Sequence, residues 1–274
     1  MILDGCHFIY GAFDSKNYGV YFAHLDTSEY MSLSGEIEPS YLFNRRNKKA
    51  YVIGDDYENS TVSFDAEIIS DDVEVISKQN RRVIEKALFN RPKFQKLSVY
   101  QDEDCLEESY EIVDGVVKSF YLMCRFINPE KIEDDSGGVV GYKFTVECDS
   151  NLMWQESSSK TFSLTGNQSD ITVVLDTDDV DYTYPKVTIQ MGTSGGDITI
   201  INSTDSTSRI TKFTGLSPSI SLVMNGNTNY ISGDNNYDKF SNQNFVRLLD
   251  GDNNLVVAGN ITSIKFEWNN KRFL

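Results

Sequence analysis

Segments with alternating apolar and polar residues recur through the second half of this chain, and this pattern most restricts its possible folds. Such alternation is typical of half-buried β-strands, because successive side chains of a strand point to opposite faces. Asn225-Gly226 adds a strong hairpin turn, and no segment with helical periodicity intervenes. We therefore predict an antiparallel β-sandwich of jelly-roll type. Its expected strands span residues 161–164, 171–175, 186–191, 197–201, 209–213, 219–224, 230–231, 245–249 and 262–268.

The first half is expected to contain one helix among its strands. Ser77 is a plausible N-cap, and Asn90-Arg91-Pro92 ends the helical pattern. Between them, an apolar stripe is formed by Val83, Ile84, Ala87 and Leu88. Strands are expected at residues 8–10, 20–23, 61–69 and 97–99.

A hairpin over residues 120–148 is predicted to close the first half. Both of its arms alternate, and the acidic, glycine-rich residues 134–138 supply the turn. Asn128-Pro129 is expected to end the first arm, because proline cannot donate to a strand ladder. The composition shifts to Ser, Thr, Asn and Gly beyond Trp154. We therefore predict two domains, residues 1–153 and residues 154–274.

The chain is acidic, with a formal net charge of −16. Residues 1–150 hold 16 basic and 28 acidic residues, which leaves this half at −12. Such a surface argues against nucleic-acid binding by neutralisation of phosphates. Residues 26–49 are polar and are expected to form a long loop that ends in a basic run, with Arg45, Arg46, Lys48 and Lys49. This loop is either a solvated flexible segment or a contact with an acidic neighbour.

No pattern in the sequence predicts catalysis or a cofactor. His7 and His24 are the two histidines, and no nucleophile, phosphate-binding or zinc motif accompanies them. The many carboxylates give no sign of the facing pair that a cell-wall hydrolase requires. The four cysteines form no C-x-x-C pair, so no disulfide framework or zinc site is expected. We expect the chain to be made in a reducing compartment. The chain is therefore predicted not to be an enzyme, and no signal peptide or membrane insertion is expected.

Two acidic clusters deserve comparison with calcium sites. The first contains Asp176, Asp178, Asp179 and Asp181; the second contains Asp250, Asp252 and Asn254. The second begins like an EF-hand loop but has Leu255 and Ile261 where such a loop needs Gly and Glu. Solvated acids at hairpin tips are the simpler interpretation of both clusters.

A carbohydrate-binding adhesin module, for example one at a cell surface, is the alternative function for a chain with a jelly roll. Such a site would stack sugars on exposed aromatic side chains. The candidates in or near loops are Tyr182, Tyr184, Tyr230, Tyr237 and Phe240.

Several stretches, taken in their order, resemble the distal tail (Dit) protein family of siphophages. They cover nearly the whole chain and are found at residues 11–15, 18–20, 62–69, 81–88, 128–133, 141–150, 154, 184–187, 196–202, 245–248 and 259–260. The resemblance implies a tail-tube-like β-sandwich or barrel with one α-helix at residues 1–153, and a galectin-like jelly roll at residues 154–274.

The resemblance also implies a structural role in the virion, at the tip of the phage tail, after synthesis in the bacterial host cytoplasm. Members of the family form a homohexameric ring that joins the tail tube protein to the tail-associated hub or lysin protein and the host-adsorption apparatus. Further implied partners are the tape measure protein and a receptor-binding protein. DNA would pass through the ring without specific binding, and no catalytic, metal or cofactor site is implied. Arg45, Arg46, Lys48 and Lys49 are our candidates for the contact between subunits.

Overall fold

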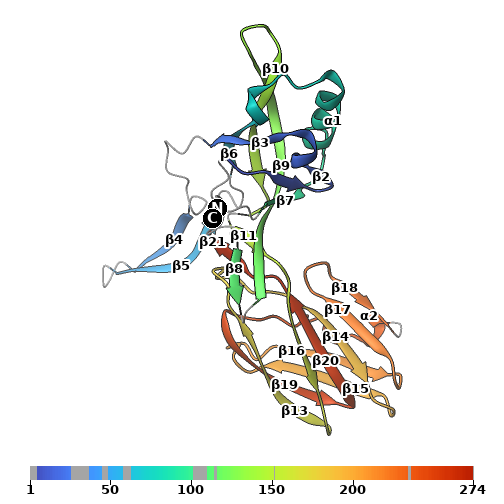
Figure 1. Ribbon diagram of the computed structural model, residues 1–274. Helices are drawn as coiled ribbons and strands as arrows, with labels where there is room; N and C mark the ends of the chain where they lie inside the picture. The colour runs from blue at the N-terminus through green and yellow to red at the C-terminus, as the bar shows by residue number, and fades with distance from the viewer. Residues whose placement is uncertain are drawn as a thin grey trace. The chain divides into compact units, whose positions relative to one another are not determined.

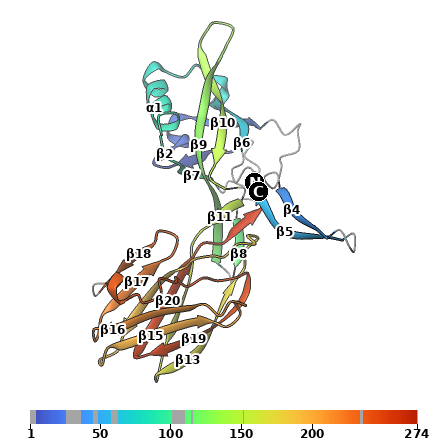
Figure 2. The ribbon, with the colours of Figure 1, turned by 180° about the vertical axis from the view of Figure 1, so that it is seen from behind.

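The computed structural model describes residues 5–25, 37–44, 49–57, 63–100, 110–113, 116–150, 152–233 and 236–273. The fold is mainly β, as predicted (Figures 1 and 2). The chain divides into two compact units: unit 1 comprises Met1–Gln155 with Phe273–Leu274, and unit 2 comprises Glu156–Arg272. No helix within the described ranges is long and apolar enough to cross a membrane.

Unit 1 is built on one curled antiparallel sheet with the strand order β2-β1-β7-β9-β10-β6-β3. Backbone bonds from Phe22 N to Cys6 O (3.0 Å) and from Gly5 N to Phe22 O (2.6 Å) connect β3 with the segment before β1. The two ends of the sheet therefore meet. The strands are β1 (Phe8–Tyr10), β2 (Phe13–Asp14), β3 (Val20–Leu25), β6 (Ser63–Ser70), β7 (Gln95–Val99), β9 (Val116–Glu133) and β10 (Val139–Cys148), with β8 (Tyr110–Val113) and β11 (Leu152–Gln155) paired to β9.

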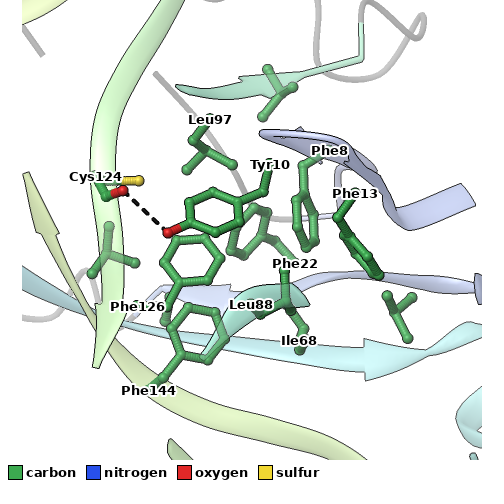
Figure 3. Close-up of a cluster of buried hydrophobic side chains, with 14 of the residues drawn as sticks. Phe8, Tyr10, Phe13, Phe22, Ile68, Leu88, Leu97, Cys124, Phe126 and Phe144 are labelled. Atoms are coloured by element: carbon green, nitrogen blue, oxygen red, sulfur yellow. Dashed lines mark hydrogen bonds between the residues drawn. The ribbon is translucent and has the colours of Figure 1, made fainter. Parts of the chain in front are cut away.

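Aromatic side chains fill the interior of unit 1. The ring of Phe126 lies 4.3 Å from that of Tyr10 and 4.6 Å from that of Phe144, measured between centroids (Figure 3). The Tyr10 hydroxyl donates to the Cys124 carbonyl at 3.2 Å, so the one polar atom of this ring is satisfied. Burial raises the pKa of Tyr10 well above its usual range. The aromatic pairs thus couple β1, β9 and β10 in one core.

Helix α1 (Lys78–Leu88) confirms the predicted helix. The Ser77 hydroxyl accepts from Asn80 N at 3.2 Å, which caps the first turn. Ile84 and Leu88 are fully buried against the sheet, and Ala87 packs beside them. Val83 was expected on the same stripe, but its position on the outer side of the helix leaves it 37% exposed.

Strand β9 corrects the prediction that Asn128-Pro129 ends a strand. It continues to Glu133, and its pairing with β10 shifts register between Lys143↔Glu130 and Thr145↔Ile127. The extra residue forms a bulge in which Asn128 adopts φ +55°. Pro129 is tolerated because a bulged residue does not have to donate to the ladder. The predicted turn at residues 134–138 is confirmed.

The expected long loop at residues 26–49 is corrected at residues 37–44 and 49, whereas residues 26–36 and 45–48 lie outside the described residues. The backbone of β4 (Ile37–Asn44) pairs antiparallel with that of β5 (Lys49–Tyr57) in a separate two-stranded sheet. Val52 and Tyr57 of β5, as well as Tyr41 and Phe43 of β4, supply β-branched and aromatic residues that favour strands. The hairpin pattern was obscured by the charged residues that surround it.

The cysteines are partly as expected. Cys124 and Cys148 are directly opposite each other in β9 and β10, and both are buried free thiols. Burial raises the pKa of Cys148 to about 12, so it is an inert apolar side chain. Cys6, however, is disulfide-bonded, which contradicts the expectation of thiols alone. Cysteine spacing could not reveal this bond, because pairing depends on the fold.

Unit 2 is a sandwich of two antiparallel sheets. One has the order β12-β20-β14-β17-β18 and the other β13-β19-β15-β16. Alternate side chains of both sheets form a single buried cluster with Phe213 and Phe266 among its largest members. The strands are β12 (Ser158–Ser163), β13 (Gln168–Leu175), β14 (Lys186–Met191), β15 (Gly196–Asn202), β16 (Ile210–Leu216), β17 (Ser221–Asn225), β18 (Tyr230–Ser232), β19 (Gly251–Gly259) and β20 (Ile261–Trp268), followed by β21 (Lys271–Phe273).

Three elements of unit 2 differ from the predictions. Residues 245–249 are not a strand and form only an isolated bridge between Leu248 and Thr183. Strand β19 was missed because it opens with Asp252, Asn253 and Asn254, which are poor strand formers. A short helix, α2 (Asn236–Lys239), also lies in this half.

Candidate interaction surfaces

The predicted inter-subunit residues fall mostly beyond the described part of the chain. Arg45, Arg46 and Lys48 lie outside the described residues, and Lys49 is described only as the backbone start of β5. The acidic stretch proposed to meet them, residues 102–111, lies outside as well except for the strand residues 110 and 111. The contact between these groups stays a prediction.

The first acidic cluster is neutralised by basic side chains from the end of the chain. Arg272 Nη2 lies 2.7 Å from Asp176 Oδ2, and Arg272 Nη1 lies 3.8 Å from Asp178 Oδ1. Lys271 Nζ lies 2.5 Å from Asp179 Oδ2. The acids therefore serve as partners for these cations. No group of three or more metal-ligating side chains is present in the ranges that the structure describes.

The members of the second cluster, Asp250, Asp252 and Asn254, are exposed, and the buried side chain among them is that of Asn253. Asn253 is fully buried; its amide nitrogen donates to Leu249 O at 2.7 Å and to Gly251 O at 3.0 Å. Its amide oxygen accepts from Leu249 N and from Asn202 Nδ2, both at 2.8 Å. This side chain satisfies both backbone groups of Leu249, which no strand ladder pairs. Its role is therefore structural.

A buried ion pair connects two loops beside this network. Arg247 Nε donates to Asp205 Oδ2 at 2.7 Å, and Arg247 Nη2 donates to Thr207 Oγ1 at 2.8 Å. The guanidinium lies 3.7 Å over the ring of Tyr182. Asp205 is only 1% exposed, and its bond to Arg247 lowers the pKa of its carboxyl to about 2. Sequence reasoning missed this pair because its members lie 42 residues apart.

The aromatic candidates for sugar stacking have different environments. Phe240 is buried and stacks on Phe213 at 4.6 Å, and Tyr182 faces Arg247. Tyr184 is half-buried. Tyr230 and Tyr237 are 54% and 55% exposed. The structure therefore does not bring the five rings together as a stacking platform.

Residues Ser15, His7 and Asp71 lie near one another but lack the geometry of a catalytic triad. Ser15 Oγ is 3.4 Å from His7 Nδ1, and His7 Nε2 is 3.9 Å from Asp71 Oδ1. Ser15 is fully buried, and its Oγ accepts from Phe8 N at 2.8 Å. His7 Nδ1 also lies 3.0 Å from the Val20 carbonyl, a position that suits a protonated nitrogen rather than a base. A buried serine oxygen cannot reach a substrate.

Helix α1 presents a cationic outer face. Lys78, Arg82 and Lys86 recur every four residues and form one ridge; Gln79, Val83 and Ala87 form the neighbouring ridge. Together with Arg91, these side chains line a shallow hollow of about 770 Å³. The one acid of the helix, Glu85, accepts from the Tyr142 hydroxyl at 3.0 Å and lies 3.8 Å from Lys131. The charged side chains of the outer face are therefore all basic.

The tip of the β9–β10 hairpin has the opposite charge. Glu130, Glu133 and Asp135 are exposed, and the tip projects beyond the rest of unit 1 (Figure 1). Asp134 Oδ1 accepts from Ser136 Oγ at 2.8 Å and from Gly138 N at 2.6 Å, and these bonds lower the pKa of its carboxyl. The turn is thus held in shape by one carboxylate while the others face solvent.

Comparisons with known proteins match both halves of the chain. A family model described as phage tail protein N-terminal domain matches residues 3–150, and one described as phage tail C-terminal domain matches residues 152–268. No curated protein matches the sequence.

Among solved structures, the chain is similar to the crystal structure of the Dit protein of phage SPP1, described as a paradigm of hub adsorption apparatus in phages that infect Gram-positive bacteria. The identity is 14%, the TM-score is 0.64, and the match covers 98% of this chain and 99% of that chain. A chain of the phage P2 baseplate in its activated conformation has 10% identity and a TM-score of 0.51 over the same shares. At these identities the likeness establishes the fold, which is that of a Dit protein.

Proposed function

Because the chain belongs to the phage tail protein family defined by these N-terminal and C-terminal domain models, we propose that it is a hub that forms a homohexameric ring at the tail tip. The observation that carries the proposal is the fold match to SPP1 Dit over 98% of the chain, which includes both units. A match to one unit alone would indicate a domain that unrelated proteins share. This match covers both units in the same order along the chain.

In this proposal residues 1–153 form the ring and residues 154–274 form a jelly roll on its outside. Ring closure requires a heterologous contact, in which each subunit presents two different surfaces to its neighbours. The ring would join the tail tube protein to the tail-associated hub or lysin protein, with the tape measure protein and a receptor-binding protein as further partners. The net charge of −12 on residues 1–150 suits a channel through which DNA passes without binding.

The basic run at residues 45–49 is proposed to contact acids of the next subunit. Replacing Arg45, Arg46, Lys48 and Lys49 with Ser is expected to weaken the ring, because each change removes a charge from the contact. Native mass spectrometry of this variant beside the wild type measures the effect. An unchanged population of six-copy species would refute the contact and leave the ring itself intact.

The oligomeric state of the purified chain tests the function directly. Native mass spectrometry is expected to give six copies, and negative-stain electron microscopy is expected to give rings with a central opening. A monomer at every concentration up to the solubility limit would contradict the proposed hub. Rings that fail to bind purified tail tubes would retain the assembly but contradict the joining role.

A further inference from the structure

The outer face of helix α1 has an arrangement of charges that is unfavourable in an isolated subunit. Lys78 and Arg82, and Arg82 and Lys86, are like charges four residues apart, and each such pair destabilises a helix by about 0.2–0.5 kcal/mol. Lys78 also occupies the first turn, where the helix dipole disfavours a cation, and no acid accompanies it there. A docked anionic surface would relieve both effects.

The described residues supply no such surface within the subunit. Glu85, the acid nearest to the cationic ridge in sequence, is engaged with Tyr142 and Lys131 on the sheet side. No carboxylate in the described ranges forms an ion pair with Lys78, Arg82 or Lys86. The helix cannot rotate about its axis toward an acidic surface, because the buried side chains of Ile84 and Leu88 hold its inner face in the core.

We propose that this face, with Val83 at its centre, docks the acidic β9–β10 hairpin tip of a second copy of the chain. The proposal rests on the hexameric ring proposed above and specifies two surfaces that meet between its subunits. The tip offers Glu130 and Glu133, which the described residues likewise leave without a cationic partner. It is therefore the complement of the helix in charge.

The two surfaces differ in shape. Lys78 and Lys86 are separated by about 12 Å along a helix that rises 1.5 Å per residue. Glu130 and Glu133 are three residues apart in β9, so the hairpin tip presents an acid on each of its two faces. A helix face meeting a hairpin tip is a contact between unlike surfaces, which is the type of contact that closes into a ring. Val83, 37% exposed in the subunit, would become buried there.

Charge reversal on both sides tests the docking. The helix variant Arg82→Glu with Lys86→Glu and the tip variant Glu130→Lys with Glu133→Lys are each expected to raise the concentration needed for ring assembly by about tenfold or more. The chain that carries all four changes restores opposite charges at every contact, so it is expected to regain the six-copy species. The matched control, Lys160→Glu with Lys212→Glu in unit 2, is expected to leave assembly unchanged.

The possible results separate the inference from the proposed function. A wild-type chain that never reaches six copies contradicts the ring and, with it, the docking. A helix variant that keeps six copies overturns the docking alone; if that variant also loses binding to purified tail tubes, the face belongs to a different tail protein. If the chain with all four changes keeps the wild-type circular dichroism spectrum and melting temperature and still fails to form the six-copy species, the hairpin tip is overturned as the occupant.

Discussion

Replacement of Arg247 by Met would leave a buried carboxylate without its cation. In the wild type, the Asp205 side chain is 1% exposed and receives Arg247 Nε at 2.7 Å. After the substitution its remaining donors are the backbone nitrogen and the hydroxyl of Thr207, at 3.0 and 2.9 Å. Water cannot replace the guanidinium fully at so enclosed an atom.

The size of the effect follows from the pKa of the Asp205 carboxyl. Its fall from the ordinary value of 3.8 to about 2 corresponds to about 2 kcal/mol of preferential stabilisation of the carboxylate. Loss of that stabilisation, together with the unpaired desolvation of the carboxylate, is expected to destabilise unit 2 by about 3–5 kcal/mol. For a domain of this size the melting temperature would fall by about 10–20 °C.

Urea unfolding at pH 7, followed by circular dichroism, measures this loss. The double variant Arg247→Met with Asp205→Asn removes the stranded charge and is expected to recover more than half of it. The control Lys186→Met breaks an ion pair with Glu267 whose side chains are 47% and 29% exposed, and it is expected to cost less than about 1 kcal/mol. A loss below about 1 kcal/mol for Arg247→Met would refute the reasoning.

Three further predictions concern both units. The folded pKa of Asp205 lies below its unfolded value, so its contribution to the free energy of unfolding is complete above about pH 4 and is lost as the pH falls through about 2. Between pH 5 and pH 2, the free energy of unfolding of the wild type should therefore fall by about 2 kcal/mol more than that of Asp205→Asn, as measured in urea titrations. Gly141→Ala should destabilise unit 1 by about 1–3 kcal/mol in thermal unfolding, because an added Cβ would overlap the Ile68 carbonyl. In the control Gly137→Ala, the added Cβ meets no neighbouring atom, and the positive φ of this residue is the single source of strain. Phe126→Ala should cost about 3–5 kcal/mol, measured in the same way, because its ring contacts Tyr10 and Phe144.

The sequence predicted best those features that depend on local signals. Helix α1 begins after Ser77 and ends before Asn90-Arg91-Pro92, because capping and helix breaking act within a few residues. Strand β14 matches its prediction at residues 186–191, because both of its neighbours bury the same alternating face. Such elements can be predicted from the residues within and beside them.

Features that depend on a distant partner escaped prediction. The bulge at Asn128 exists only in relation to β10, so the sequence suggested a strand end instead. The acids at 176–179 find their cations at 271 and 272, more than 90 residues later, and so resembled an unpaired cluster. Sequence reasoning did not single out Asn253, which the fold encloses as a donor and acceptor for the backbone of Leu249.

The bulge in β9 has a consequence for solubility. Beyond Cys124, no described strand pairs with the edge of β9 that faces away from β10, so within the described residues this stretch is a sheet edge. An extended free edge invites a strand from another chain and is a common origin of aggregation. Pro129 removes one donor and Asn128 bends the ladder, so an incoming strand cannot stay in register along it. The irregularity therefore disfavours pairing of this edge with a strand from another chain.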